Sequence, residues 1–320
     1  MEKPGENSQL QPVVVTVLGE RLPDELGIVD AHNHVWIEPV PGTFPELPHL
    51  TRQEAIVQEL VDYRQAGGGA IVDCQPGGCG RNGLKLAELA RLSGVQIVAC
   101  TGFHLPKYYP PGYWLFQAGA TQAADLFISE IQDGLLETRT VGEPVRAGFI
   151  KIACQASLTL TPPPLLEASV AASLQTGSAV EVHTEKGQAA LDILSHFSSQ
   201  GLDPRRLVLC HMDKHPDFGL HRELAQAGVT LEYDTFYRPK YDPENNLWPL
   251  LERMAAGGLA VQVALATDMA ESEMWARLGG GPGLVSLPAQ IGPRLRSLGI
   301  GEPEIAGMLG GNITRCLAHA

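Results

Sequence analysis

The sequence predicts a single (β/α)8 barrel, a fold in which eight parallel strands are each followed by a helix. Short apolar runs rich in β-branched residues alternate with stretches of helical spacing, a pattern typical of parallel strands buried on both faces. Eight such runs occur, which is the number that a closed barrel needs. The glycine-rich stretch 67–83 lacks the GxGxxG and GK[ST] spacings of nucleotide-binding sheets, so an open doubly wound sheet is disfavoured.

The predicted elements follow one another along the whole chain. The strands are expected at 28–34, 70–75, 95–101, 148–154, 178–184, 206–211, 229–234 and 261–268. Helical spacing is clearest at 51–67, 84–92, 165–177 and 186–201, where closing glycines fit helix C-caps. The longest connections, 102–119 and 235–246, follow strand ends, on the face where barrel enzymes carry their chemistry. No linker divides the chain, so we expect a flexible tail at 1–12 and one domain over 13–320.

Composition narrows the classes of partner. The 320 residues include 23 Lys and Arg against 36 Asp and Glu, a formal net charge of −13, which disfavours nucleic acid and anionic lipid as partners. No apolar stretch reaches the roughly 18 residues of a membrane helix, and the polar N-terminus does not resemble a signal peptide. The six scattered cysteines are expected to be reduced. We therefore expect a cytoplasmic protein that acts on a small molecule.

An HxH pair ends the first predicted strand. His32 and His34 are two residues apart, so both imidazoles point to the same side of that strand and can bind one metal ion at the barrel mouth. Taken alone, the pair is more typical of two hydrogen-bonded histidines at a strand end.

Three further candidates end later strands. His183 and His211 are separated by 28 residues, one βα unit, and Asp268 follows 57 residues later, two such units. If these histidines were only hydrogen-bonded within a polar layer of the barrel, their spacing would not be expected to repeat with the βα unit. Four histidines and one aspartate at strand ends suit a borderline ion such as zinc.

Lys151 lies inside GFIKIAC, an otherwise apolar strand. A buried ammonium without a partner is costly, and burial lowers its pKa. One interpretation is a lysine whose amine reaches water at the strand end. The other is a neutral amine that takes up CO₂ and becomes an anionic carbamate between two metal ions. The histidines and the aspartate on the same face favour the carbamate.

This set of residues, on strands 1, 4, 5, 6 and 8, resembles the binuclear amidohydrolase superfamily. The segments VTVLGERLPDELGIVDAHNHV, RAGFIKIA, VEVHTEKG, LCHMDKHPD and GGNITRCLA resemble its phosphotriesterase-like family, and within it the lactonase branch, over residues 13–318. The resemblance implies that His32, His34 and Asp268 bind a buried metal ion. It further implies that His183 and His211 bind a more exposed one, and that N6-carboxylated Lys151 bridges the two.

The resemblance also implies a mechanism. A hydroxide bridging two divalent ions would attack the substrate, while Asp268 serves as metal ligand and general base. Zinc is the first choice, and manganese, cobalt and iron accept the same ligands. Barrels of this family often pair through their βα loops, so a homodimer is the implied assembly.

Departures from the family pattern bear on the substrate. Organophosphate-degrading members carry an acid and a histidine where this chain has Lys214 and Thr235, so their outward proton relay is expected to be missing. His104 stands where the acyl-homoserine-lactone branch has a tyrosine beside the metals. Arg238 and Lys240 follow the seventh strand as a candidate clamp for a phosphate or carboxylate, the alternative being two solvated surface cations.

The sequence therefore predicts a binuclear metal hydrolase that opens a lactone, with a phosphorylated or otherwise anionic lactone favoured by the two cations. Phosphotriesterase, phosphoesterase or amidase activity at the same metals remains the alternative, because the ligands alone do not separate these reactions. A third hypothesis, from another class, is a non-catalytic metal-binding barrel.

Overall fold

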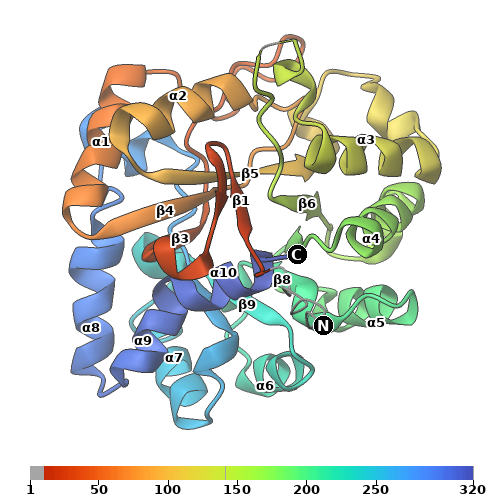
Figure 1. The fold of residues 1–320 in the computed structure, drawn as a ribbon. Coiled ribbons are helices and arrows are strands. Elements are labelled where there is room, and N and C mark those ends of the chain that lie inside the picture. Colours follow the sequence, from red (N-terminus) through yellow and green to blue (C-terminus); the bar gives the residue numbers. More distant parts are fainter. Residues whose placement is uncertain (1–10, 141, 320) are drawn as a thin grey trace, which may run out of the picture.

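Eight parallel strands form a nearly closed barrel in the computed structural model, which describes residues 11–140 and 142–319. The order across the sheet is β10-β9-β8-β7-β6-β5-β4-β3, so that neighbours in the sequence are neighbours in space (Figure 1). The predicted (β/α)8 barrel is confirmed. Residues 1–10 of the predicted tail lie outside the described residues.

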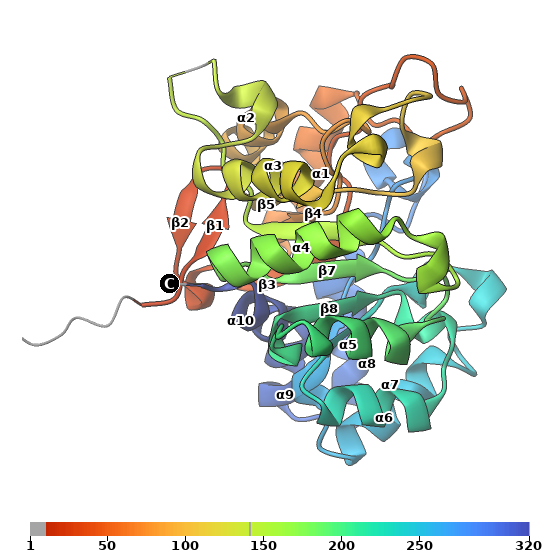
Figure 2. The same ribbon diagram turned by 90° about the vertical axis from the view of Figure 1, so that its right-hand side faces the viewer.

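The strands lie where the apolar runs predict them, within about two residues at most ends. Their bounds are β3 Ile28–Asn33, β4 Gly68–Asp73, β5 Gln96–Gly102, β6 Phe149–Ala153, β7 Val180–His183, β8 Leu207–Cys210, β9 Thr230–Tyr233 and β10 Val263–Leu265. The last strand is shorter than predicted, because 260–262 form a 3-10 turn. An antiparallel hairpin of β1 Val14–Thr16 and β2 Gly19–Arg21, which the sequence analysis did not predict, lies at one end of the barrel (Figure 2).

Helices surround the strands (Figures 1 and 2). They are α1 Gln53–Gln65, α2 Gly83–Ser93, α3 Ala120–Gln132, α4 Pro163–Thr176, α5 Ala190–Ser199, α6 Phe218–Gln226, α7 Leu247–Ala256, α8 Gly292–Ser297, α9 Glu302–Ala306 and α10 Asn312–Leu317. Local sequence sets their ends: the Asn82 side chain accepts a hydrogen bond from the Lys85 backbone N–H at the start of α2, and Gly94 ends that helix with a positive φ.

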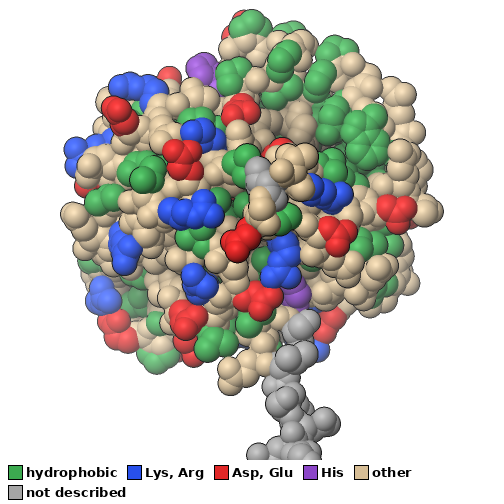
Figure 3. Space-filling view, turned by 45° about the horizontal axis from the view of Figure 1, so that its top comes forward, with side chains coloured by type: hydrophobic (Ala, Val, Ile, Leu, Met, Phe, Trp, Pro, Cys, Tyr) green, Lys and Arg blue, Asp and Glu red, His purple; other side chains and the backbone are tan. Residues whose placement is uncertain are grey.

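Within the described residues, no helix has both the length and the apolar character that a membrane span requires. All six cysteines are buried and free. On the face drawn in Figure 3, the described acidic and basic side chains are interspersed, so this face offers no continuous basic surface to a polyanion.

Side chains close the barrel between its first and last strands, where no backbone ladder joins the described parts of β3 and β10. Asp30 of β3 accepts hydrogen bonds from the backbone N–H and the hydroxyl of Thr267, at 3.0 and 2.5 Å. Asn33 donates to both Asp30 and Thr267, at 2.9 and 2.7 Å. The backbone N–H of Asp268 donates to the carbonyl of His32 at 3.0 Å. This seam brings two predicted metal ligands side by side.

Asp30→Ala is expected to lower the free energy of unfolding by about 3 kcal/mol, because it removes several hydrogen bonds to a buried carboxylate and leaves their donors unpaired. Urea denaturation measures the change. Asp125→Ala, on the exposed side of α3, is the matched control and should change stability by less than about 0.5 kcal/mol. Equal losses in both variants would contradict a structural role for the seam.

Candidate metal centre

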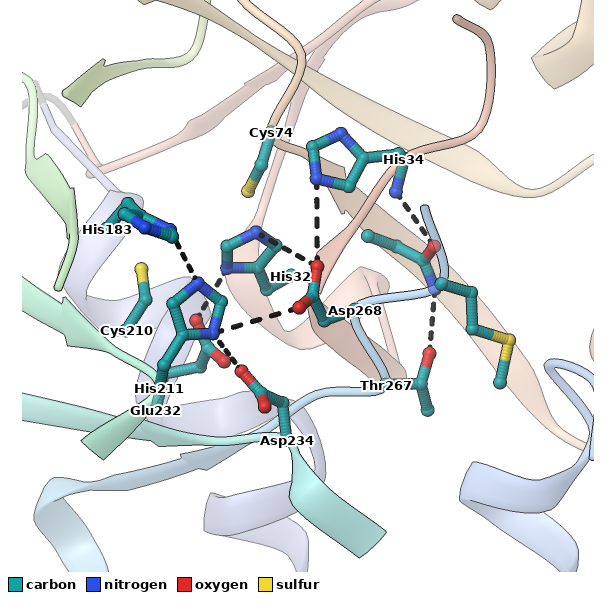
Figure 4. A network of polar contacts seen from close by, with 12 residues as sticks. His32, His34, Cys74, His183, Cys210, His211, Glu232, Asp234, Thr267 and Asp268 are labelled. Atoms are coloured by element: carbon teal, nitrogen blue, oxygen red, sulfur yellow. Dashed lines mark hydrogen bonds and ion pairs between the residues drawn. The ribbon is translucent and has the colours of Figure 1, made fainter. Parts of the chain in front are cut away.

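The carboxyl ends of the barrel strands bring the predicted metal ligands together. His32 lies in β3 with His34 just beyond it, His183 ends β7, and His211 and Asp268 follow β8 and β10. Figure 4 shows these five side chains pointing toward one space, with Asp268 between the histidines. Lys151 enters from β6 and is fully buried.

His32, His34 and Asp268 form one half of the centre. Oδ1 of Asp268 lies 3.7 Å from Nε2 of His32 and 3.7 Å from Nε2 of His34. The Gln75 side-chain amide donates to the Cys79 carbonyl, so its oxygen is left to accept from Nδ1 of His34, at 2.7 Å. The Nε2 lone pair of His34 is therefore directed toward Asp268 and available to a metal ion.

The second half consists of His183 and His211. Nδ1 of His183 is 2.9 Å from Nε2 of His211, and Nδ1 of His211 is hydrogen-bonded to Asp234. Oδ2 of Asp268 lies 3.8 Å from Nδ1 of His211, whereas Oδ1 faces His32 and His34. The two oxygens of this carboxylate therefore face the two halves of the centre. At this distance one ring donates a hydrogen bond to the other, so both nitrogens are directed at the same point, and a cation bound by both would replace that hydrogen bond.

The electrostatics of these groups suit a divalent ion. Burial lowers the pKa of His32 to about 3 and lowers that of the three other histidines of the centre, His34, His183 and His211. All four are thus neutral and keep a free lone pair. Burial raises the pKa of Asp268, but interactions with His211, His32 and Lys214 lower it by more, so the carboxyl is ionised; at neutral pH, where the histidines carry no charge, Lys214 is the cation of this group. Neutral imidazoles with a carboxylate are a donor set that zinc and related ions bind.

Lys151 lies deeper in the barrel. Its Nζ is 2.7 Å from Oε1 of Glu181, 3.3 Å from Sγ of Cys210 and 3.4 Å from Nδ1 of His32. Sγ of Cys74 is also 2.9 Å from Oε1 of Glu181, so Cys74 and Cys210 both lie beside the Lys151–Glu181 ion pair. Glu181 was not predicted as a site residue, although it precedes His183 by two residues on the same strand and therefore shares its side.

Two candidate ligands have unusual backbone conformations. His211 and Asp268 adopt φ values of 63° and 46°, in the left-handed region that residues other than glycine rarely occupy. Each costs of the order of 1 kcal/mol or more and persists only where the surroundings enforce it. His211 directly follows β8 and Asp268 lies three residues after the end of β10, and at both positions the left-handed backbone redirects the side chain into the centre.

The predicted substrate-binding residues lie at different distances from the centre. A guanidinium nitrogen of Arg238 is 3.3 Å from Oδ2 of Asp268. His104 packs beside His183, with ring centroids 5.1 Å apart. Lys240 is exposed, and its amine lies 5.1 Å from the Tyr241 ring.

A further cation borders the centre. Nζ of Lys214 is 3.9 Å from Asp268, 3.6 Å from Asp234 and 5.8 Å from the same Tyr241 ring. In the sequence this lysine stood out only as a departure from a proton relay. Its position three residues after His211, in the same loop at the end of β8, was the signal that could have identified it.

A pocket of about 140 Å³ opens beside the histidines, and neither Lys214 nor Arg238 lines it. His34, Gln75 and His104 form its wall toward the centre. Most of its remaining wall comes from the connection after β3 and is apolar: Ile37, Pro39, Val40, Phe44, Pro45, Leu47 and Pro48.

Known proteins resemble this chain in sequence and in fold. The Phosphotriesterase family profile matches residues 12–317. The phospho-furanose lactonase of Mycoplasmopsis synoviae (strain 53) is 28% identical over 320 aligned positions, covering 95% of this chain and 91% of the relative. The N-acetyltaurine hydrolase of Salmo salar is 27% identical over 353 positions, covering 97% and 99%. A solved lactonase structure from Listeria monocytogenes has the same fold, with a TM-score of 0.87 at 24% identity, covering 95% of this chain and 98% of that one.

Proposed function

The chain belongs to the phosphotriesterase family, and on that premise we propose that it is a metal-dependent hydrolase that opens a lactone ring bearing an anionic group. The observation that carries this proposal is the convergence of four neutral histidines and an ionised Asp268 on one space, with Lys214 and Arg238 at its edge. The relative named phospho-furanose lactonase supports the choice of substrate class.

In this proposal the ligands fall into two groups. His32, His34 and Asp268 hold one divalent ion, His183 and His211 hold the other, and a carboxylated Lys151 lies between the two. Zinc is the first choice for both positions. Ions bound there would polarise the ester carbonyl and lower the pKa of a water molecule.

Asp268 handles the proton in this proposal. Its ionised carboxylate accepts the proton that the attacking water releases, and it returns a proton to the ring oxygen when the C–O bond breaks, which gives a hydroxy acid. The guanidinium of Arg238, 3.3 Å away, restrains the orientation of that carboxylate.

The anionic group of the substrate would meet Lys214 and Arg238, with Lys240 further out beside Tyr241. Arginine can form paired hydrogen bonds to a phosphate or carboxylate, and lysine supplies a compact charge. The rest of the lactone would then extend toward the apolar pocket on the other side of the histidines.

Hydrolysis of an amide is the second candidate, because the N-acetyltaurine hydrolase of Salmo salar matches 97% of the chain. A dedicated phosphotriesterase is less well supported. The backbone N–H and the hydroxyl of Thr235 both donate to Oδ2 of Asp213, at 2.7 and 2.6 Å, so this oxygen is bound within the barrel rather than to an outward histidine.

Proton release by the zinc-loaded protein tests the proposal across plain, homoserine and phosphorylated sugar lactones, a phosphotriester and N-acyl amides. Rapid turnover confined to anionic lactones is the expected result.

Arg238→Gln should raise KM for anionic lactones about 10- to 100-fold, because a charged hydrogen bond worth about 1.5–3 kcal/mol is lost. It should change KM for neutral lactones far less. Arg253→Gln, on the exposed side of α7, is the control. Inactivity toward every lactone together with turnover of an amide or phosphoester would overturn the proposed substrate.

A further inference from the structure

Two carboxyl groups from the end of β9 lie beneath the histidines. Glu232 lies in β9 and Asp234 directly follows it, and both are fully buried. Oε2 of Glu232 lies 2.6 Å from Nδ1 of His32, and Oδ2 of Asp234 contacts Nδ1 of His211. Each carboxyl group therefore holds one histidine, and the two histidines belong to different halves of the centre (Figure 4).

The two carboxyl groups are also close to each other. One oxygen of Glu232, one of Asp234 and a ring nitrogen of His211 all lie within 4.8 Å of one another. The other oxygens, Oε1 of Glu232 and Oδ1 of Asp234, have no hydrogen-bond partner among the described residues. Glu232 and Asp234 therefore lie close together beneath the centre, each in contact with a histidine of a different half.

A simpler interpretation is that Glu232 only balances the buried charge of Lys151. The Lys151 amine, however, is paired with Glu181 at 2.7 Å, on the adjacent part of the barrel. Neutralising Lys151 therefore does not require Glu232. Nδ1 of His32, in turn, lies 2.6 Å from Glu232 but 3.4 Å from both the Lys151 amine and Oε1 of Glu181, so Glu232 is the nearest of these three partners.

We infer that Glu232 is a positioning residue of the metal centre: it accepts the Nδ1–H of His32 and directs the Nε2 lone pair of that ring to the ion. This inference rests on the metal centre of the proposed function. A carboxylate behind a ligating histidine fixes its tautomer and ring orientation, and its loss typically costs 10- to 100-fold in metal affinity.

The histidine tautomers of the metal-free wild-type protein provide the first test. Long-range ¹H–¹⁵N correlation spectra should show His32 protonated at Nδ1, with Nε2 carrying the lone pair. A His32 protonated at Nε2 instead would overturn the inference, and this test needs no variant to fold.

Two substitutions provide the second test, with zinc affinity measured by competition against a chromophoric chelator. Glu232→Gln keeps an oxygen that can accept from Nδ1–H, and its affinity should remain within about threefold of the wild type. Glu232→Leu removes the acceptor and should weaken zinc binding 10- to 100-fold, with loss of the single His32 tautomer. Wild-type affinity and tautomer in Glu232→Leu would refute the positioning role. Neither readout uses a substrate, so failure of lactone turnover would count against the proposed function alone.

Discussion

Asp268→Asn is expected to lower turnover by about three orders of magnitude while the protein stays folded. Asparagine keeps the size of the side chain and tolerates the left-handed backbone at this position, where φ is 46°. Its amide cannot accept the proton of the attacking water, and general base catalysis contributes about 10²- to 10⁴-fold. Single-turnover and steady-state rates on the best lactone of the panel measure the loss.

The control for this substitution is Asp217→Asn, which changes an exposed side chain at the start of α6, where asparagine also caps helices well. It should retain wild-type turnover. An Asp268→Asn variant with unchanged kcat and full zinc content would show that another group handles the proton.

Lys151→Ala is expected to lose at least one of the two metal ions per chain and to reduce turnover to the uncatalysed background. In the wild type, a carbamate signal should appear after incubation with ¹³C-bicarbonate and zinc, and should be absent from the metal-free protein. The structure gives the reason for this dependence: the amine is held in an ion pair with Glu181 at 2.7 Å, which favours ammonium over the neutral amine that reacts with CO₂.

The same substitution leaves Glu181 buried without its partner, which destabilises the fold by about 3–5 kcal/mol. The double variant Lys151→Ala/Glu181→Gln removes the unpaired charge and should recover most of that stability without recovering metal or turnover. Metal content and thermal denaturation of both variants separate the two effects. Wild-type turnover in Lys151→Ala would end the hypothesis of a bridging lysine.

The barrel could be predicted from the sequence because its signal is local and repeated. Eight apolar runs and the helical spacing at α1, α2, α4 and α5 depend only on which face of each element is buried, and each recurs within a single βα unit. The β1–β2 hairpin carries a signal of only three residues per strand, too short to separate from a loop. The seam of Asp30, Asn33 and Thr267 joins residues 234 or more positions apart, which no local pattern reveals.

For the site, the sequence predicted which strand-end residues come together but not which residues lie behind them. His32, His183 and Asp268 end strands, and all parallel strands of a barrel end on one face, so their convergence follows from the topology. Their partners across the barrel do not: that Glu232 meets His32 depends on the stagger between β9 and β3, which strand periodicity does not specify.

The loops show the same limit. The charge pattern after β9 identified Arg238, which reaches Asp268, and gave equal weight to Lys240, which the structure leaves exposed beside Tyr241. Side-chain direction in such a connection is set by its turns and by its contacts with neighbouring loops, and residue type does not specify either.

The seam between β3 and β10 has a consequence for when the protein acquires its chemistry during synthesis. His32 and Asp268, on either side of that junction, are contributed by opposite ends of the polypeptide. While β10 is still inside the ribosome, the other seven strands of the sheet have already been synthesised. Such a chain lacks Asp268, and it also lacks the contacts of Thr267 with Asp30 that join the first and last strands. If His32, His34 and Asp268 bind an ion as proposed, that ion can be bound by all three only once the whole barrel has formed. A truncated product that stops before β10 is expected to be inert rather than partly active.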